Sequence, residues 1–180
     1  EVGVKGSSAD RRLGYEVAAY YIDWDNFQTV ATFSGVTAGA NARDGISVRG
    51  FETTLNYQAT DDFRYNFGLS YTDSTLNGDE PGLFGQKGDS VPNIPKWTLN
   101  LGGVYDFRAF DNSPAWLSAN LYYKDSAPSA FDDGSPARTS VNVPSDSYTL
   151  ANITAGIEFA NTTVTAYVNN AFDTRAYTLY

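Results

Sequence analysis

The sequence predicts an all-β protein, specifically a segment of an antiparallel transmembrane β-barrel with about eight strands, short periplasmic turns and long outer loops. Three observations support this prediction. Apolar and polar residues alternate with a period of two along most of the chain, one side of that alternation is nearly free of charge, and short connections alternate with long ones. A helix would instead need apolar residues three and four positions apart.

The clearest element is a hairpin at residues 50–72. Residues 51–59 and 63–72 each place mostly apolar side chains at every second position, with polar residues between them. Asp61 and Asp62 lie between the two arms, where short polar residues favour a turn. The two arms therefore predict a sheet with one apolar face and one polar face.

The other strands are predicted from the same alternation. Short turns are expected after the first, third, fifth and seventh strands, and long loops after the others, an asymmetry typical of outer-membrane barrels. The six remaining strands are expected at residues 1–6, 13–27, 97–107, 117–124, 148–159 and 163–169. Long loops are expected at residues 29–43, 73–95 and 125–146, and the Pro- and Gly-rich second loop is expected to lack any compact element.

Aromatic residues are expected to mark two membrane interfaces. Trp97 and Phe107 lie ten residues apart. At about 3.3 Å per residue and a strand tilt of about 40°, this separation spans roughly 25 Å along the barrel axis, which is the height of the apolar band in such barrels. The aromatic residues assigned to strand ends are Phe63, Tyr65, Phe107 and Trp116 beside short turns, and Trp24, Tyr71, Trp97 and Tyr123 beside long loops.

The composition restricts the chemistry that the chain can perform. It contains neither histidine nor cysteine, so the commonest general base and every thiolate site are absent. The 21 acidic and 12 basic residues give a formal net charge of −9, which argues against nucleic acid as a partner. A catalytic pair of Glu52 and Glu158 has no accompanying nucleophile motif. We therefore expect a protein that is not an enzyme, with no catalytic residue, no cofactor and no resident metal.

The polar side of the alternation supplies one group of candidate site residues. In a barrel these side chains would face a water-filled lumen, where they either contact a plug or a passing ligand or simply hydrate the lumen. The lumen-facing candidates are Glu52, Asn56, Arg64, Asn100, Lys124 and Glu158.

The expected outer loops supply a second group of candidates. Their carboxylates are hard oxygen ligands of the kind that Ca²⁺ prefers, but the spacing of an EF-hand is absent and solvated loops carry similar residues. The candidate ligand-contacting residues are Trp24, Gln28, Asp79, Glu80, Asp89, Asp132 and Asp133.

Several short motifs follow one another in an order that covers nearly the whole chain. In chain order they are ExGxK at residues 1–5, AYYIDWDNFQ at residues 19–28, RGFE at residues 49–52, YTD at residues 71–73, GDSVPNIPKWTLNLGGVYDF at residues 88–107 and YVNNAFD at residues 167–173. Each motif is weak alone. Together they resemble the TonB-dependent receptors of the Gram-negative outer membrane, in the C-terminal part of their barrel.

The resemblance implies a wall segment of a barrel of about 22 strands with a plugged lumen, surrounded by outer-membrane lipid. Such receptors import a scarce nutrient, for example a ferric siderophore, with energy delivered through TonB. Residues 1–180 contain no recognisable plug domain or TonB-contacting segment, and the residues before Tyr180 lack the usual glycine-containing terminal signal. The expectation is one barrel domain or barrel fragment over residues 1–180, with transport belonging to a parent protein.

Two other interpretations fit the same alternation. A self-contained outer-membrane barrel of eight strands could act as an anchor or adhesin, since eight strands suffice to close a small barrel. A soluble ligand-binding β-barrel would instead turn the apolar face inward. Strand count and closure separate the first two interpretations, and a requirement for detergent separates both from the third.

Overall fold

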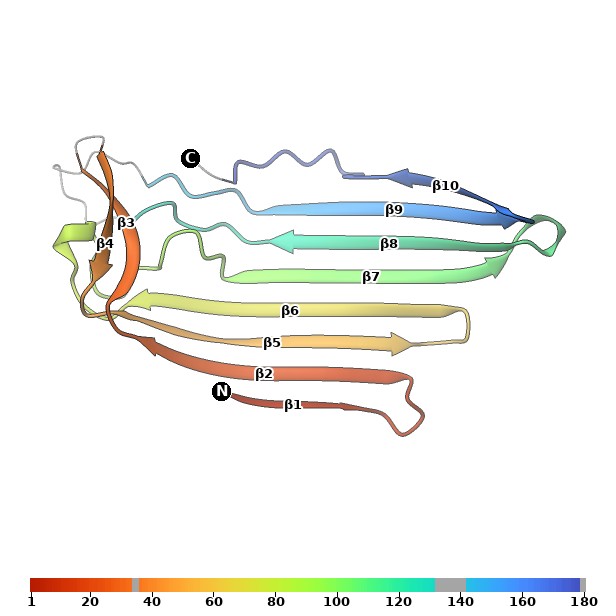
Figure 1. Ribbon diagram of the computed structural model, residues 1–180, viewed down its shortest axis with the longest axis horizontal. Coiled ribbons are helices and arrows are strands. Elements are labelled where there is room, and N and C mark those ends of the chain that lie inside the picture. The colour runs from red at the N-terminus through yellow and green to blue at the C-terminus, as the bar shows by residue number, and fades with distance from the viewer. Residues whose placement is uncertain (34–35, 132–141, 179–180) are drawn as a thin grey trace.

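The computed structural model describes residues 1–33, 36–131 and 142–178, and its main element is an eight-stranded antiparallel sheet. Figure 1 shows these strands lying side by side, with short turns at one end and the long connections at the other. These two ends are called the short-turn end and the long-loop end. The strands are β1 (Val2–Ser7), β2 (Leu13–Trp24), β3 (Phe27–Phe33), β4 (Val36–Ala42), β5 (Ile46–Gln58), β6 (Phe63–Leu76), β7 (Trp97–Arg108), β8 (Pro114–Lys124), β9 (Tyr148–Phe159) and β10 (Thr162–Val168).

The sheet has the order β1-β2-β5-β6-β7-β8-β9-β10, and β3 and β4 form a separate two-stranded sheet. The predicted eight strands and the alternation of short and long connections are confirmed. A self-closed eight-stranded barrel would require β1 to pair with β10, but these strands form opposite edges in the described part of the chain. Within that part, no helix is long and apolar enough to cross a membrane.

The strand register gives the sheet two chemically different faces. Leu55 lies opposite Phe67, which lies opposite Leu101, so apolar side chains continue across neighbouring strands. One position along, Asn56 lies opposite Asn66 on the other face. We call these the apolar face and the polar face. The charged residues of the eight strands on the polar face are Lys5, Glu16, Glu52, Arg64, Asp106, Arg108, Lys124 and Glu158, and those on the apolar face are Asp23, Arg49 and Asp73.

The prediction of a long irregular loop at residues 29–43 is wrong. Strands β3 and β4 form a hairpin there, with Gln28 opposite Asn41, and this hairpin lies across the long-loop end of the main sheet. The preceding strand β2 also ends at Trp24 rather than near Phe27. Alternation could not reveal the hairpin because residues 38–40 are small side chains with no apolar contrast, whereas the backbone hydrogen bonds of a ladder need none.

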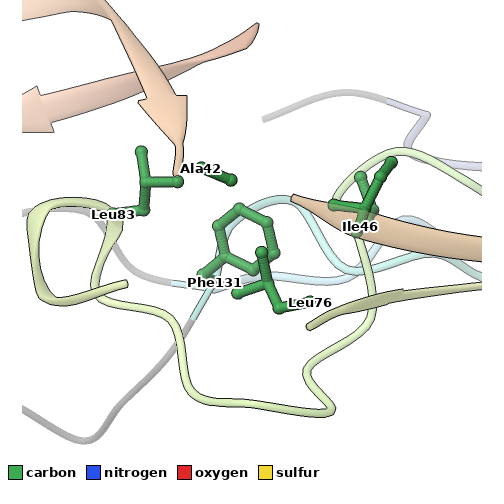
Figure 2. Packing of buried hydrophobic residues seen from close by; sticks show 6 residues of the cluster. Ala42, Ile46, Leu76, Leu83 and Phe131 are labelled. Atoms are coloured by element: carbon green, nitrogen blue, oxygen red, sulfur yellow. The ribbon is translucent and has the colours of Figure 1, made fainter. Parts of the chain in front are cut away.

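The prediction that residues 73–95 hold no compact element is also wrong. Strand β6 continues to Leu76, and residues Pro81–Leu83 form the 3₁₀-helix η1. This segment contributes to a small apolar core at the long-loop end, shown in Figure 2. The buried members of this core are Ala42, Ile46, Leu76, Leu83, Val91 and Phe131. Because they come singly from several segments, no periodic pattern in the sequence indicates them.

The polarity of the two faces reverses near the long-loop end of β5 and β6. Ile46 and Leu76 have the alternation of the polar face, yet both are buried in the apolar core. Arg49 and Asp73 have the alternation of the apolar face, yet both are charged. The reversal begins on the long-loop side of Gly50 and Thr72, which lie opposite each other. It marks where the surroundings of the sheet change.

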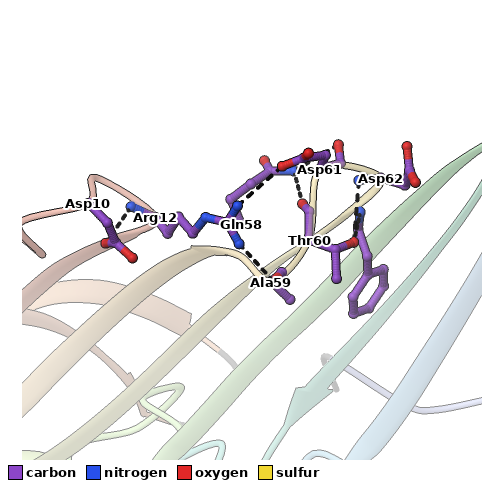
Figure 3. A network of polar contacts seen from close by, with 8 residues as sticks. Asp10, Arg12, Gln58, Ala59, Thr60, Asp61 and Asp62 are labelled. Atoms are coloured by element: carbon purple, nitrogen blue, oxygen red, sulfur yellow. Dashed lines mark hydrogen bonds and ion pairs between the residues drawn. The ribbon is translucent and has the colours of Figure 1, made fainter.

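The short turns are held by local hydrogen bonds, as Figure 3 shows for the β1–β2 and β5–β6 connections. The Thr60 hydroxyl accepts a hydrogen bond from the backbone amide of Phe63 at 3.0 Å, and the side-chain amide of Gln58 donates through Nε2 to the backbone carbonyl of Thr60 at 2.7 Å. Arg12 forms an ion pair with Asp61 at 3.2 Å and thereby joins the two turns. The predicted role of Asp61 and Asp62 as turn residues is confirmed.

Candidate functional site

The six residues predicted to line a lumen all lie on the polar face. The register nevertheless spreads them over β5 to β9 rather than bringing them into one cluster. Glu52 and Lys124 share a row but are separated by β6 and β7, about 14 Å at ~4.8 Å per strand. Glu158 lies beside the short β9–β10 turn, ten residues along β9 from Tyr148, which shares the row of Glu52. This distribution suits an extended polar wall and offers no pair of carboxylates for catalysis.

Direct contacts along this wall join neighbouring strands. Arg64 of β6 forms an ion pair with Asp106 of β7. The Asn120 side chain of β8 donates a hydrogen bond from Nδ2 to the side-chain oxygen Oδ1 of Asn100 on β7 at 2.8 Å. Such links pair some of the polar side chains of the wall with one another and leave the wall wettable.

Trp116 is a residue of the polar face that the sequence interpretation assigned wrongly to an aromatic band. It lies opposite Gly156 of β9 and next to Asp106 of β7 in the register, on the polar face. With Glu158 and Arg108 it lines a hollow of about 530 Å³ at the short-turn end. The signal was present in the sequence, because Trp116 has the same parity as Ser118 rather than Leu117.

Two aromatic bands do occur on the apolar face. The outer band, at the long-loop end, contains Phe51, Tyr71 and Trp97, which lie in one row across β5, β6 and β7. Their ring centroids are 4.6 Å apart for Tyr71 and Trp97 and 5.9 Å apart for Phe51 and each of the others. The inner band contains two aromatic pairs at the short-turn end, Phe63 with Tyr65 and Tyr105 with Phe107.

The long-loop end places two of the predicted ligand-contacting residues at one hollow. Asp79 and Glu80 line a hollow of about 820 Å³ together with Asn41, Arg43 and Asp44. Glu80 is buried, with a relative exposure of 7%, and its Oε1 accepts a hydrogen bond from the Asp44 amide at 2.8 Å. The Asp79 carboxylate accepts one from the Lys87 amide at 2.8 Å. Both carboxylates therefore help to fix the loops that surround the hollow.

The other predicted loop residues have different environments. Trp24 packs edge-on against Phe27 at a centroid distance of 5.2 Å and remains exposed at the end of β2. Gln28 is an exposed residue of strand β3. The Asp89 carboxylate accepts a hydrogen bond from the Gln86 amide at 2.8 Å and closes a turn.

Asp132 and Asp133 lie outside the described residues. Among the residues that are described, no three acidic side chains converge as they would around a metal ion.

A charged cluster on the apolar face was not predicted. Arg49 donates to Asp73 Oδ2 from Nε at 3.0 Å and from Nη2 at 2.8 Å, and Lys96 Nζ lies 3.2 Å from Asp73 Oδ1. Asp73 lies two residues beyond Tyr71, outside the strand segments between the two aromatic bands. The hydrogen bonds from Arg49, followed by those from Lys96, hold the pKa of the Asp73 carboxyl below its ordinary value, against the opposing effect of burial.

Comparison with known proteins gives a consistent result. A family model described as "TonB dependent receptor-like, beta-barrel" matches residues 1–171. Two curated relatives are metal-pseudopaline receptors named CntO from Pseudomonas aeruginosa. The receptor of strain PAO1 is 32% identical and that of strain UCBPP-PA14 is 30% identical, each over 181 aligned residues and 98% of this chain. The chain spans 23% of the length of both relatives.

Solved structures share the fold. The siderophore receptor PiuA of Acinetobacter baumannii superposes with a TM-score of 0.70 at 23% identity, covering 98% of this chain and 24% of the receptor. The ferric yersiniabactin uptake receptor FyuA of Yersinia pestis gives a TM-score of 0.75 at 16% identity, covering 98% of this chain and 25% of the receptor. At these identities the likeness concerns the fold, and it agrees with the antiparallel strands and the open sheet described above.

Proposed function

Because the chain belongs to the TonB-dependent receptor family through its β-barrel, we propose that it forms a wall segment of an outer-membrane receptor that imports a metal held by a small chelating molecule. Residues 1–180 would act as one unit of barrel wall. The closed barrel would require further strands at the β1 and β10 edges, where backbone hydrogen-bonding groups would otherwise meet lipid.

The match to curated receptors carries this proposal. Relatives at 30% and 32% identity along 98% of the chain are receptors for a metal chelate, and the solved structures include a receptor of the outer membrane that binds ferripyoverdine. The chain covers about a quarter of such proteins, so transport itself would be a property of the whole receptor. A plug domain and TonB would be its partners there.

The two faces give the proposed orientation. The apolar face would contact outer-membrane lipid, because the described strands have no charged side chain on this face between the aromatic bands. The polar face would line the lumen and would contact water, a plug or a passing ligand. The proposed lumen residues are Glu52, Asn56, Arg64, Asn100, Lys124 and Glu158, to which we add Trp116.

The ligand would first meet the long-loop end. The hollow beside Asp79 and Glu80 is open and is lined mostly by polar side chains, which suits the polar surface of a metal chelate. Trp24 and Gln28 are each two residues from Asn26, which lines the same hollow. They would add contacts at the edge of the hollow. Asp89 would act indirectly, by holding its turn.

An uptake experiment tests this function. Cells with and without the complete receptor gene that encodes this chain would be grown under metal limitation and supplied with metal-pseudopaline, ferripyoverdine or ferric yersiniabactin. Cell-associated metal would be measured by mass spectrometry. Deletion should abolish uptake of at least one chelate, and the restored gene should recover it. Unchanged uptake of every metal chelate would contradict a role in metal import.

Within the restored gene, Asp79→Asn should weaken ligand binding without loss of the protein from the outer membrane. Asp61→Asn at the opposite, short-turn end is the matched control, since it removes the same charge from an exposed site. Equal binding by both variants would remove the hollow from the proposed ligand path.

A further inference from the structure

The apolar face has charged strand residues only beyond its outer aromatic band, at least among the described residues. They are Asp23, Arg49 and Asp73, and Lys96, which directly precedes β7, reaches Asp73. In a chain with a net charge of −9, two basic side chains gathered on the face that would contact lipid require an explanation.

The geometry keeps both basic groups available. Asp73 is covered, with a side-chain exposure of 8%, whereas Arg49 and Lys96 are 71% and 49% exposed. A guanidinium group carries five N–H donors, and the contacts with Asp73 use two of them. Asp73 beneath Arg49 and Lys96 leaves these three residues with a net charge of +1 and holds both basic side chains against one carboxylate, whereas Asp23 on the same face accepts a hydrogen bond from Asn77.

The cluster also lies at a defined height relative to the outer aromatic band. Arg49 and Asp73 are each two residues beyond Phe51 and Tyr71, about 7 Å along a strand. Aromatic bands lie at the level where acyl chains meet head groups. Charged groups two residues further toward the long-loop end would therefore be level with the phosphates of the lipid head groups.

We propose that Arg49 and Lys96 form a binding site for the phosphate group of an anionic lipid in the outer leaflet. The inference rests on the proposed orientation of the apolar face toward lipid. Arg49 presents a planar fork of donors suited to phosphate oxygens, and Lys96 adds a compact charge beside it. Phe51, Tyr71 and Trp97 lie below the site and would contact the upper part of the acyl chains.

Lipid titration followed by native mass spectrometry tests the site. The complete receptor in a non-ionic detergent would be titrated with dioleoyl phosphatidic acid, dioleoyl phosphatidylcholine or inorganic phosphate. Phosphatidic acid should bind most tightly, and Arg49→Gln or Lys96→Gln should each weaken it about tenfold, as expected for loss of a hydrogen bond to a charged group. Arg49→Lys should lie between the wild type and Arg49→Gln, because it keeps the charge and loses the fork.

Arg12→Gln is the matched control, because Arg12 forms an exposed ion pair with Asp61 at the opposite end of the sheet. Its affinity for phosphatidic acid should equal that of the wild type. Equal affinity of all variants would overturn the site, and binding of inorganic phosphate with the same dependence on Arg49 would overturn the assignment to lipid. Heat-modifiable migration on gels would show that each variant is folded.

The test also separates this inference from the proposed function. Metal-chelate uptake would be measured with the same variants in cells. Retained uptake with unchanged lipid affinity would overturn the lipid site alone. Lipid binding that depends on Arg49 in a protein without any uptake role would overturn import and leave the site standing.

Discussion

The indole ring of Trp116 lies against Gly156, its direct neighbour on the adjacent strand. A Cβ atom added to Gly156 would approach the Trp116 ring within 2.1 Å, closer than any real contact. The absence of a side chain on β9 therefore creates the space that a large aromatic side chain of β8 occupies. Glycine in a strand interior commonly marks such a close approach.

Gly156→Ala should displace the Trp116 ring and destabilise the barrel by about 1–3 kcal/mol, the range for overpacked sites. Urea unfolding in detergent, followed by tryptophan fluorescence, measures this change. Gly68→Ala is the control, because Gly68 also lies on the polar face and its added Cβ would have only ordinary contacts, the nearest at 3.8 Å. Equal unfolding midpoints for the two variants would contradict the predicted packing.

Leu55→Arg should impair insertion of the barrel, because Leu55 lies opposite Phe67 near the middle of the apolar face. The expected cost is about 2–4 kcal/mol for a basic residue near the bilayer midplane. Folding into lipid vesicles in a urea titration measures it, and Asn56→Arg on the polar face provides the control. If Leu55→Arg folds as well as Asn56→Arg, the assignment of the two faces is wrong.

Leu76→Ala should loosen the long-loop end while leaving the sheet intact. Leu76 is buried in the apolar core at 2% exposure, and large-to-small substitutions at such positions cost about 2–5 kcal/mol. Limited proteolysis of intact cells should cut the loops faster than in the wild type. Val30→Ala serves as the control, since Val30 is 68% exposed on β3 at the same end. Equal cleavage of both variants would show that the core does not hold the loops.

Asp73 should make stability depend on pH in the acid range. Its pKa is lowered in the folded protein, so its contribution to stability is complete above the unfolded pKa of about 3.9 and is lost as the pH falls through the lower, folded value. Urea unfolding midpoints measured between about pH 5 and pH 2 should fall less steeply in Asp73→Asn than in the wild type. Identical slopes would argue against the contact with Arg49.

The sequence was sufficient for the sheet because alternation reports directly on a strand with two different faces. The Gly50–Thr72 hairpin, with Leu55 opposite Phe67, follows from parity alone. Parity also assigns Glu52 and Arg64 to one face, but it contains no information on which residues of that face touch. The contact between Asn100 and Asn120 depends on the register between β7 and β8, which the sequence does not specify.

The long-loop end was predicted less well for a physical reason. Its core uses apolar residues such as Leu83 and Phe131, which lie in segments rich in Pro, Gly and Asp without an alternating pattern, so burial there depends on contacts between distant segments. The cluster of Arg49, Asp73 and Lys96 was missed because Asp73 was assigned to a loop, and Arg49 and Lys96 were assigned to no strand. Their parity in β5 and β6 was sufficient to place Arg49 and Asp73 on the face of Phe51 and Tyr71.

The reversal of polarity at Gly50 and Thr72 has a consequence for how the wall can move. If the apolar face contacts lipid as proposed, sliding β5 and β6 toward the cell would bring Arg49 and Asp73 into hydrocarbon, and sliding them outward would bring Phe51 and Tyr71 into water. The same two strands therefore resist vertical displacement in both directions. A piston-like stroke of this wall is disfavoured, so any pulling force from the periplasm would have to be taken up by something other than these strands.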